Sequence, residues 1–146
     1  MSKVADYLKD HIEGEVSVAT NKRQHFAGDA SALKHLPQII VSPHGEQDVR
    51  KITRFAWQLA ERGKVMPIVP RGGGSDLSGG AVGQAIVLAL EPHLNKVIEF
   101  DDKKGRVTVE PGANFGRLHH NLTFSHGSYV PAYPSSLNYS TVGGAI

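Results

Sequence analysis

The chain has 146 residues, of which 16 are Lys or Arg and 14 are Asp or Glu, so its formal net charge is only +2. This length predicts one globular unit, and a hydrophobic content of 40% excludes wholesale disorder. The small net charge and the absence of a long basic run argue against nucleic-acid binding. The absence of cysteine excludes disulfides, thiol nucleophiles and iron–sulfur ligation by this chain.

The N-terminal part, residues 1–36, carries only one periodic pattern. Val4, Leu8 and Ile12 recur at a spacing of four and predict a short amphipathic helix. Residues 16–36 are polar and aperiodic, so we expect an irregular surface segment. No signal peptide and no membrane-length apolar run are visible, so we expect a soluble, cytoplasmic protein.

An α/β pattern begins at residue 37. Residues 37–43 are β-branched and bounded by prolines, which predicts a strand with one edge unable to donate to a neighbour. A helix follows, because Val49, Ile52 and Leu59 repeat at helical spacing and Gly63 comes after the last turn. The later expected elements are strands at 65–69 and 85–90, a hairpin of 97–100 with 107–110, and a helix from 115 to about 126.

The segment 70–80, with the sequence PRGGGSDLSGG, lies between two of these strands. Adjacent glycines let several backbone N–H groups point into one concavity, which is an anion-binding arrangement, and Arg71, Ser75 and Ser78 add a cation and two hydroxyls. The alternative is a flexible surface turn. A P-loop is excluded because no Lys-Ser or Lys-Thr follows, and Leu77 stands where a dinucleotide fingerprint needs glycine. From the residues alone we predict binding of an anionic phosphate ligand.

The order of these motifs resembles the FAD-binding domain of the p-cresol methylhydroxylase and vanillyl-alcohol oxidase superfamily over residues 37–146. Besides the segment 70–80, the resemblance rests on the Pro-Gly pair at 111–112, the Pro-Ser pair at 134–135 and the Thr-Val-Gly-Gly run at 141–144. Residues 26–31 are also similar to a segment of the D-lactate dehydrogenase and glycolate oxidase flavoproteins.

The resemblance implies an α+β fold of the PCMH type, in which a small parallel sheet with helices is followed by a hairpin. It divides the chain into an N-terminal helix and irregular segment, 1–36, and an FAD-binding domain, 37–146, truncated at its C-terminal end. Family members continue after the Gly-Gly pair, so we expect the substrate contacts to lie outside this chain, and we assign no catalytic residue.

The resemblance also implies which residues bind FAD. Histidine makes the covalent flavin link in several family members, and Ser75 stands at that position, so the FAD is expected to be non-covalent. The expected cofactor-binding residues are Arg71, Gly72, Gly73, Gly74, Ser75, Asp76, Ser78, Gly79, Pro134, Ser135, Thr141, Gly143 and Gly144.

The function implied is that of the FAD-binding part of a flavin-dependent oxidoreductase that oxidises a 2-hydroxy acid such as D-lactate or glycolate. The alternatives are the corresponding part of a nucleotide-sugar enol-ether reductase and a non-catalytic anion-binding or interaction module. Apolar surface left uncovered predicts self-association.

Two other groups of polar residues are candidates for chemistry. His119, His120 and His126 do not converge well on a helix, so we expect no metal site. Asp101 and Asp102 fit a hairpin turn better than a carboxylate pair.

Overall fold

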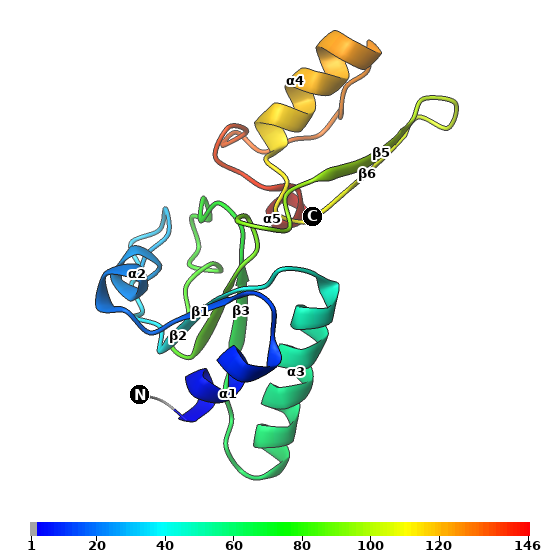
Figure 1. Ribbon diagram of the computed structural model, residues 1–146. Helices are drawn as coiled ribbons and strands as arrows, with labels where there is room; N and C mark the ends of the chain where they lie inside the picture. Colours follow the sequence, from blue (N-terminus) through cyan, green and yellow to red (C-terminus); the bar gives the residue numbers. More distant parts are fainter. Residues whose placement is uncertain (1–2) are drawn as a thin grey trace.

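A four-stranded sheet forms the lower part of the molecule in the computed structural model, which describes residues 3–146 (Figure 1). Its strands are β1 (Glu15–Ser17), β2 (Ile39–Ser42), β3 (Ile68–Arg71) and β4 (Ile86–Ala89), in the order β1-β2-β4-β3. β4 pairs in parallel with both β2 and β3, and β1 adds to β2 in the antiparallel sense. The connection from β2 to β3 runs through α3 (Glu46–Glu61).

The two faces of this sheet are covered differently, as the alternation of side chains along β2 shows. Ile39 and Val41 face α1 (Lys3–His11) and α3, and they belong to one buried cluster with Leu8 and Ile52. Ile40 faces the other side, where the cluster includes the ring of Phe26. That second face is covered by the segment that holds α2 (Thr20–His25). Residues 3–36 therefore complete the core of the sheet.

The second part of the molecule follows β4 and lies at one end of the sheet (Figure 1). It consists of the hairpin β5 (Val97–Asp101) and β6 (Arg106–Val109), then α4 (Phe115–His126) and the short helix α5 (Val142–Ala145). α4 buries Phe115, Leu118 and Leu122 and ends at Gly127, whose φ of 58° lies in the left-handed region that favours glycine.

The α+β fold with a small parallel sheet, helices and a following hairpin is confirmed. Three details of the expected elements are wrong. The strand expected at 37–43, with one edge unable to pair, is β2 and pairs on both edges. Both edges can pair because Pro37 and Pro43 fall just outside the paired residues 39–42. Residues 16–36 are not wholly irregular, since they hold the end of β1 and all of α2. β3 begins at Ile68 and includes Pro70, which an edge strand tolerates.

A buried carboxylate joins the start of β1 to the start of α3. Asp48 is 3% exposed and accepts hydrogen bonds from the backbone N–H groups of Glu13, Gly14 and His44, at 3.0, 2.8 and 2.9 Å. Burial acts to raise the pKa of Asp48, but these donors together outweigh it and hold the pKa below its ordinary value of 3.8. The carboxylate is therefore ionised in the native state at neutral pH.

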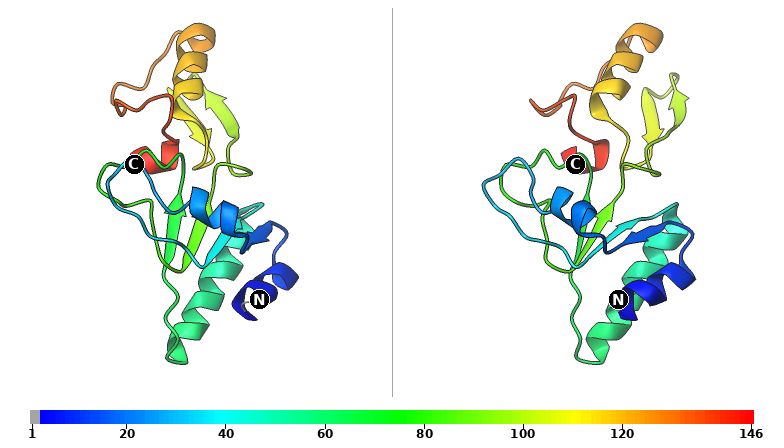
Figure 2. Two further views of the ribbon diagram at one scale, coloured as in Figure 1. Left: turned by 90° about the vertical axis from the view of Figure 1, so that its left-hand side faces the viewer. Right: turned by 60° about the vertical axis from the view of Figure 1, so that its left-hand side comes forward.

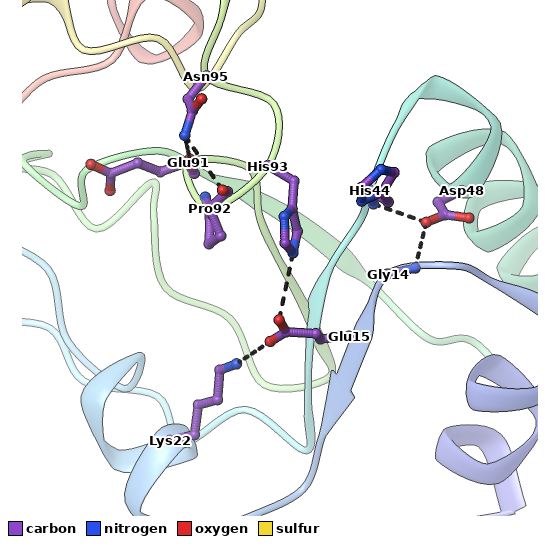
Figure 3. A network of polar contacts seen from close by, with 9 residues as sticks. All are labelled: Gly14, Glu15, Lys22, His44, Asp48, Glu91, Pro92, His93 and Asn95. Atoms are coloured by element: carbon purple, nitrogen blue, oxygen red, sulfur yellow. Dashed lines mark hydrogen bonds and ion pairs between the residues drawn. The ribbon is translucent and has the colours of Figure 1, made fainter.

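A second polar contact joins the sheet to the connection that leads into the hairpin (Figure 3). Glu15 on β1 pairs with Lys22 at 3.2 Å and lies 3.6 Å from His93. In the same connection, the side-chain amide of Asn95 donates to the carbonyl oxygen of Glu91 at 2.7 Å.

Among residues 3–146, no helix is both long enough and apolar enough to cross a lipid bilayer.

Candidate cofactor site

A hollow of about 560 Å³ lies where the sheet meets the second part of the molecule. One wall is the glycine loop, residues 72–80, which follows the carboxyl end of β3. The other is the serine segment, residues 134–144, which ends in α5. Figure 2 shows the red end of this segment beside the green loop. The lining residues are Pro70, Gly72, Gly73, Gly74, Ser75, Asp76, Leu77, Gly80, Ala81, Pro134, Ser135, Ser136, Ser140, Thr141 and Gly144.

The glycine loop presents a run of backbone N–H groups that no described residue accepts. Among residues 3–146, the N–H groups of 73–77 make no hydrogen bond to backbone or side chain, whereas those of Ser78 and Gly80 donate to Asp76. Gly74 has a φ of 69°, so the chain turns through the left-handed region in the middle of this run. Successive N–H groups around such a turn form a nest for an anion.

Close approach of the two walls explains the glycines at 72 and 73. A Cβ at Gly72 would overlap Oγ1 of Thr141, and one at Gly73 would overlap the carbonyl oxygen of Tyr139. Any side chain at these positions would therefore push the serine segment away from the loop.

The serine segment is held in place by the start of α4. Backbone N–H groups of Phe115, Val142 and Gly143 donate to the carbonyl oxygens of Ser140, Ala113 and Pro111, at 2.9, 2.9 and 2.8 Å. These bonds form the second wall of the hollow from residues that are far apart in the sequence.

Asn114 supports both the helix and the serine segment. Its Oδ1 accepts from the N–H of Arg117 at 2.9 Å and caps α4, while its Nδ2 donates to the carbonyl oxygen of Asn138, also at 2.9 Å. One side chain thus ties the helix start to the wall.

Arg71 lies beneath the glycine loop rather than in the hollow. Its Nη1 donates to the carbonyl oxygen of Gly28 at 2.7 Å, and its guanidinium lies 5.2 Å from the centre of the Phe26 ring. A Cβ on Gly74 would overlap this guanidinium, so the charge sits directly under the turn. Burial lowers the pKa of Arg71, and the charge of Asp29 opposes this effect. Because pH 7 lies far below the pKa of an arginine, the guanidinium stays charged at neutral pH.

Asp76 organises the far half of the loop. Its Oδ2 accepts from the N–H of Gly80 at 2.6 Å and from the hydroxyl of Ser78 at 2.8 Å. The hydrogen bond from Gly80, with those from Ser78, holds the pKa of Asp76 below its ordinary value. Ser78 and Gly79 do not line the hollow, and the Gly79 backbone instead lies against the side chain of Leu33.

The structure brings most of the expected cofactor residues to one hollow, from both walls. The expected residues that line it are Gly72, Gly73, Gly74, Ser75, Asp76, Pro134, Ser135, Thr141 and Gly144. Gly143 packs against Pro111 instead. Ser136, which the sequence offers with Ser135 as a phosphate contact or helix cap and not as a nucleophile, also lines the hollow. Sequence reasoning did not single out Ser140, although the density of serine before Thr141 was a signal for it.

The other groups considered from the sequence lie elsewhere. Nδ1 of His126 lies 2.9 Å from Oδ1 of Asp102, whereas the rings of His119 and His120 pack near Tyr133 and Phe124. Within the described part of the chain, no group of His, Asp and Glu side chains has the arrangement of a metal site.

Solved structures share this fold. An alkyldihydroxyacetonephosphate synthase matches 97% of this chain with a TM-score of 0.81 at 21% identity, the match covering 28% of that chain. p-Cresol methylhydroxylase matches 97% with a TM-score of 0.79 at 17% identity, over 28% of its length. At these identities the likeness concerns the fold alone.

Several proteins are also similar to this chain in sequence. The D-2-hydroxyglutarate dehydrogenase of Haemophilus influenzae is 32% identical over 98% of this chain, which spans 14% of that protein. The glycolate oxidase subunit GlcD of Bacillus subtilis is 30% identical over 76% of this chain and 23% of its own length. The D-lactate dehydrogenase of Archaeoglobus fulgidus is 35% identical over 74% of this chain and 23% of its own length. The FAD binding domain family matches residues 37–146, and the chain therefore belongs to this family.

Proposed function

We propose that the hollow between the glycine loop and the serine segment holds the pyrophosphate of FAD. The observation that carries this proposal is the run of backbone N–H groups at residues 73–77, which have no acceptor among residues 3–146. Unpaired donors are costly when water is displaced from them, and phosphate oxygens would satisfy them.

Two further features of the hollow fit this group. Oγ1 of Thr141 is buried in the wall and has no hydrogen-bond partner among the described residues. The guanidinium of Arg71 lies under Gly74 and adds positive charge beneath the nest without occupying it. Both features favour an anionic ligand with further polar groups.

A binding titration that compares ligands tests the proposal. The chain should bind FAD and ADP, both of which carry a pyrophosphate, and should not bind riboflavin, which has no phosphate. Isothermal titration calorimetry measures all three. Riboflavin binding as tight as that of FAD would overturn the proposal, because recognition would then not involve the phosphates.

The parent activity that we propose is oxidation of a 2-hydroxy acid. D-2-Hydroxyglutarate, glycolate and D-lactate, named in the three relatives, all belong to this chemical class. This chain spans about 14% of the first of these proteins, so its own part in the reaction is to bind and orient the cofactor. When bound, the flavin supplies the two-electron redox chemistry. The hydroxy-acid substrate is expected to contact residues outside this chain.

We also propose that the FAD is held without a covalent bond. Ser75 lines the hollow, and its hydroxyl lies 3.1 Å from that of Ser140. Acid precipitation of the flavin-loaded protein should leave the flavin in the supernatant. A yellow pellet would contradict this.

Self-association is a further part of the proposal. An apolar hollow of about 550 Å³ lies among β6, α4 and the last residues, where Val109, Val142 and Ile146 line it. We expect a second copy of the chain to cover this face, and sedimentation velocity should show a mass that rises with concentration. A single monomeric species at all concentrations would contradict this.

A cytoplasmic location stays a prediction, to be tested by cell fractionation.

A further inference from the structure

Three serine hydroxyls meet at the junction of the two walls. Oγ of Ser140 lies 3.1 Å from Oγ of Ser75 on the glycine loop and 2.6 Å from Oγ of Ser136 in the serine segment. It also donates to the carbonyl oxygen of Ser136 at 3.0 Å. Ser140 is 3% exposed, so it is the buried member of the group, although all three serines border the hollow.

The proton count at this junction permits one arrangement that satisfies every contact. A serine hydroxyl has one proton and two lone pairs, and a carbonyl oxygen can only accept. If Ser140 gives its proton to the carbonyl of Ser136, its two lone pairs remain for the other hydroxyls. Ser75 and Ser136 must then both donate to Ser140. Every other assignment leaves one of these contacts without a proton.

This arrangement changes what the hollow offers to a ligand. With their protons directed at Ser140, Ser75 and Ser136 present lone pairs to the hollow and act as acceptors. The hydroxyl of Ser78 is also committed, since it donates to Asp76 at 2.8 Å. Donors to an anion therefore come from the loop backbone, and the serine oxygens suit a ligand group that carries a proton.

We propose that Ser140 is a positioning residue that holds the glycine loop against the serine segment and keeps Ser75 and Ser136 as acceptors. The ligand group they accept from is a hydroxyl or amino group next to the pyrophosphate of a nucleotide. This inference rests on the proposed binding of FAD and adds which side chains accept hydrogen bonds from the cofactor.

Replacing Ser140 tests the proposal with ligands that differ in this group. Ser140→Ala frees the protons of Ser75 and Ser136, so FAD and ADP should bind about tenfold more weakly, equivalent to about 1.4 kcal/mol. Inorganic pyrophosphate, which has no hydroxyl attached to carbon and no amine, should bind within about twofold of wild type. Ser140→Thr, which keeps the hydroxyl, should restore most of the FAD affinity. The exposed Ser125→Ala on α4 is the matched control and should change neither ligand.

A double-mutant cycle shows whether Ser140 acts through Ser75. Ser75→Ala combined with Ser140→Ala should bind FAD more tightly than the product of the two single losses predicts, because Ser140 acts partly through Ser75 and partly through Ser136. Multiplication of the two losses would overturn the proposal, and so would an equal loss of pyrophosphate and ADP in Ser140→Ala.

A measurement without ligand separates this inference from the proposed function. The N–H of Ala30 donates to the carbonyl oxygen of Gly74 at 3.1 Å and reports on the position of the loop. In Ser140→Ala its hydrogen exchange should be about tenfold faster, equivalent to about 1.4 kcal/mol of local stability, while exchange in β2 and β4 stays unchanged. If wild type binds no FAD but this exchange accelerates, the FAD proposal fails and the structural role stands. Unchanged exchange at Ala30 would overturn the positioning role.

Discussion

Gly73 is a residue at which the two walls of the hollow approach closely, because its backbone lies against the carbonyl oxygen of Tyr139. Gly73→Val should therefore displace the serine segment and weaken FAD binding by about 100-fold, equivalent to about 2.7 kcal/mol. The far-UV circular dichroism should stay nearly the same, since the buried strands β2 and β4 are not touched. Gly45→Ala is the control, because a Cβ there meets no atom within 4 Å. A folded Gly73→Val protein with wild-type FAD affinity would favour a surface turn over a binding loop.

Asp48 is a residue whose charge contributes to stability and not to the site. Asparagine offers only one acceptor oxygen to the three N–H groups that Asp48 binds, so at least one buried donor loses its partner. Asp48→Asn should lower the free energy of unfolding at pH 7 by about 1–3 kcal/mol. The exposed Asp10→Asn should change it by no more than about 0.5 kcal/mol.

The pH dependence of this effect has a defined sign. The pKa of Asp48 in the folded state lies below its ordinary value of 3.8, so the ionised carboxylate stabilises the fold above that pH. The contribution is lost as pH falls through the folded pKa. In urea titrations, the difference between wild type and Asp48→Asn should therefore shrink between about pH 5 and pH 2. A constant difference across that range would show that ionisation of Asp48 does not matter.

Among the helices and strands, the sequence predicted those that have a periodic apolar pattern or a recognisable helix end. α3 has apolar residues at helical spacing and acidic residues in its first turn, and α4 ends at a glycine in the left-handed region. β1 and α2 were not predicted. β1 has only three residues and depends on pairing with β2, and α2 buries no residue, so neither leaves a local pattern. Such elements depend on tertiary contacts that no short window of sequence contains.

Asn114 at the start of α4 both caps the helix and holds the serine segment, and one substitution separates these two roles. Asn114→Asp keeps an oxygen to cap the helix but places a second oxygen against the carbonyl of Asn138. Helix content should stay unchanged while FAD affinity falls about tenfold, or about 1.4 kcal/mol. Asn95→Asp removes a similar amide-to-carbonyl bond in the connection after β4 and should leave FAD affinity unchanged. Equal losses in the two variants, by fluorescence titration, would contradict the role of Asn114.

For the whole molecule, the residues alone predicted the glycine loop as one wall, whereas the wall with the Pro-Ser and Thr-Val-Gly-Gly motifs was predicted only through the family resemblance. What the sequence could not show is the direction of individual side chains. The guanidinium of Arg71 donates to the carbonyl oxygen of Gly28, the hydroxyl of Ser75 lies against that of Ser140, and the hydroxyl of Ser78 donates to Asp76. These directions depend on contacts between segments more than 40 residues apart in two of the cases.

The chain by itself is expected to bind the cofactor without oxidising a substrate. Among the described residues that line the hollow, none is Lys, Arg or His, and Arg71, which lines an adjoining hollow, donates to the carbonyl oxygen of Gly28. With added FAD, D-lactate or glycolate and an artificial electron acceptor, turnover should not exceed that of free FAD. Saturable turnover by the 146-residue chain would show that it contains a substrate site.

The position of the cofactor is most directly tested by amide resonances in ¹H–¹⁵N spectra of the chain titrated with FAD. If the nest holds the pyrophosphate, the largest shifts should fall on the N–H groups of residues 73–77, because these are the donors without acceptors among residues 3–146. The separate hollow near Phe100 and Tyr129, at the hairpin, should show little change. Shifts confined to that second hollow, or the absence of shifts in residues 73–77 at saturating FAD, would contradict the account.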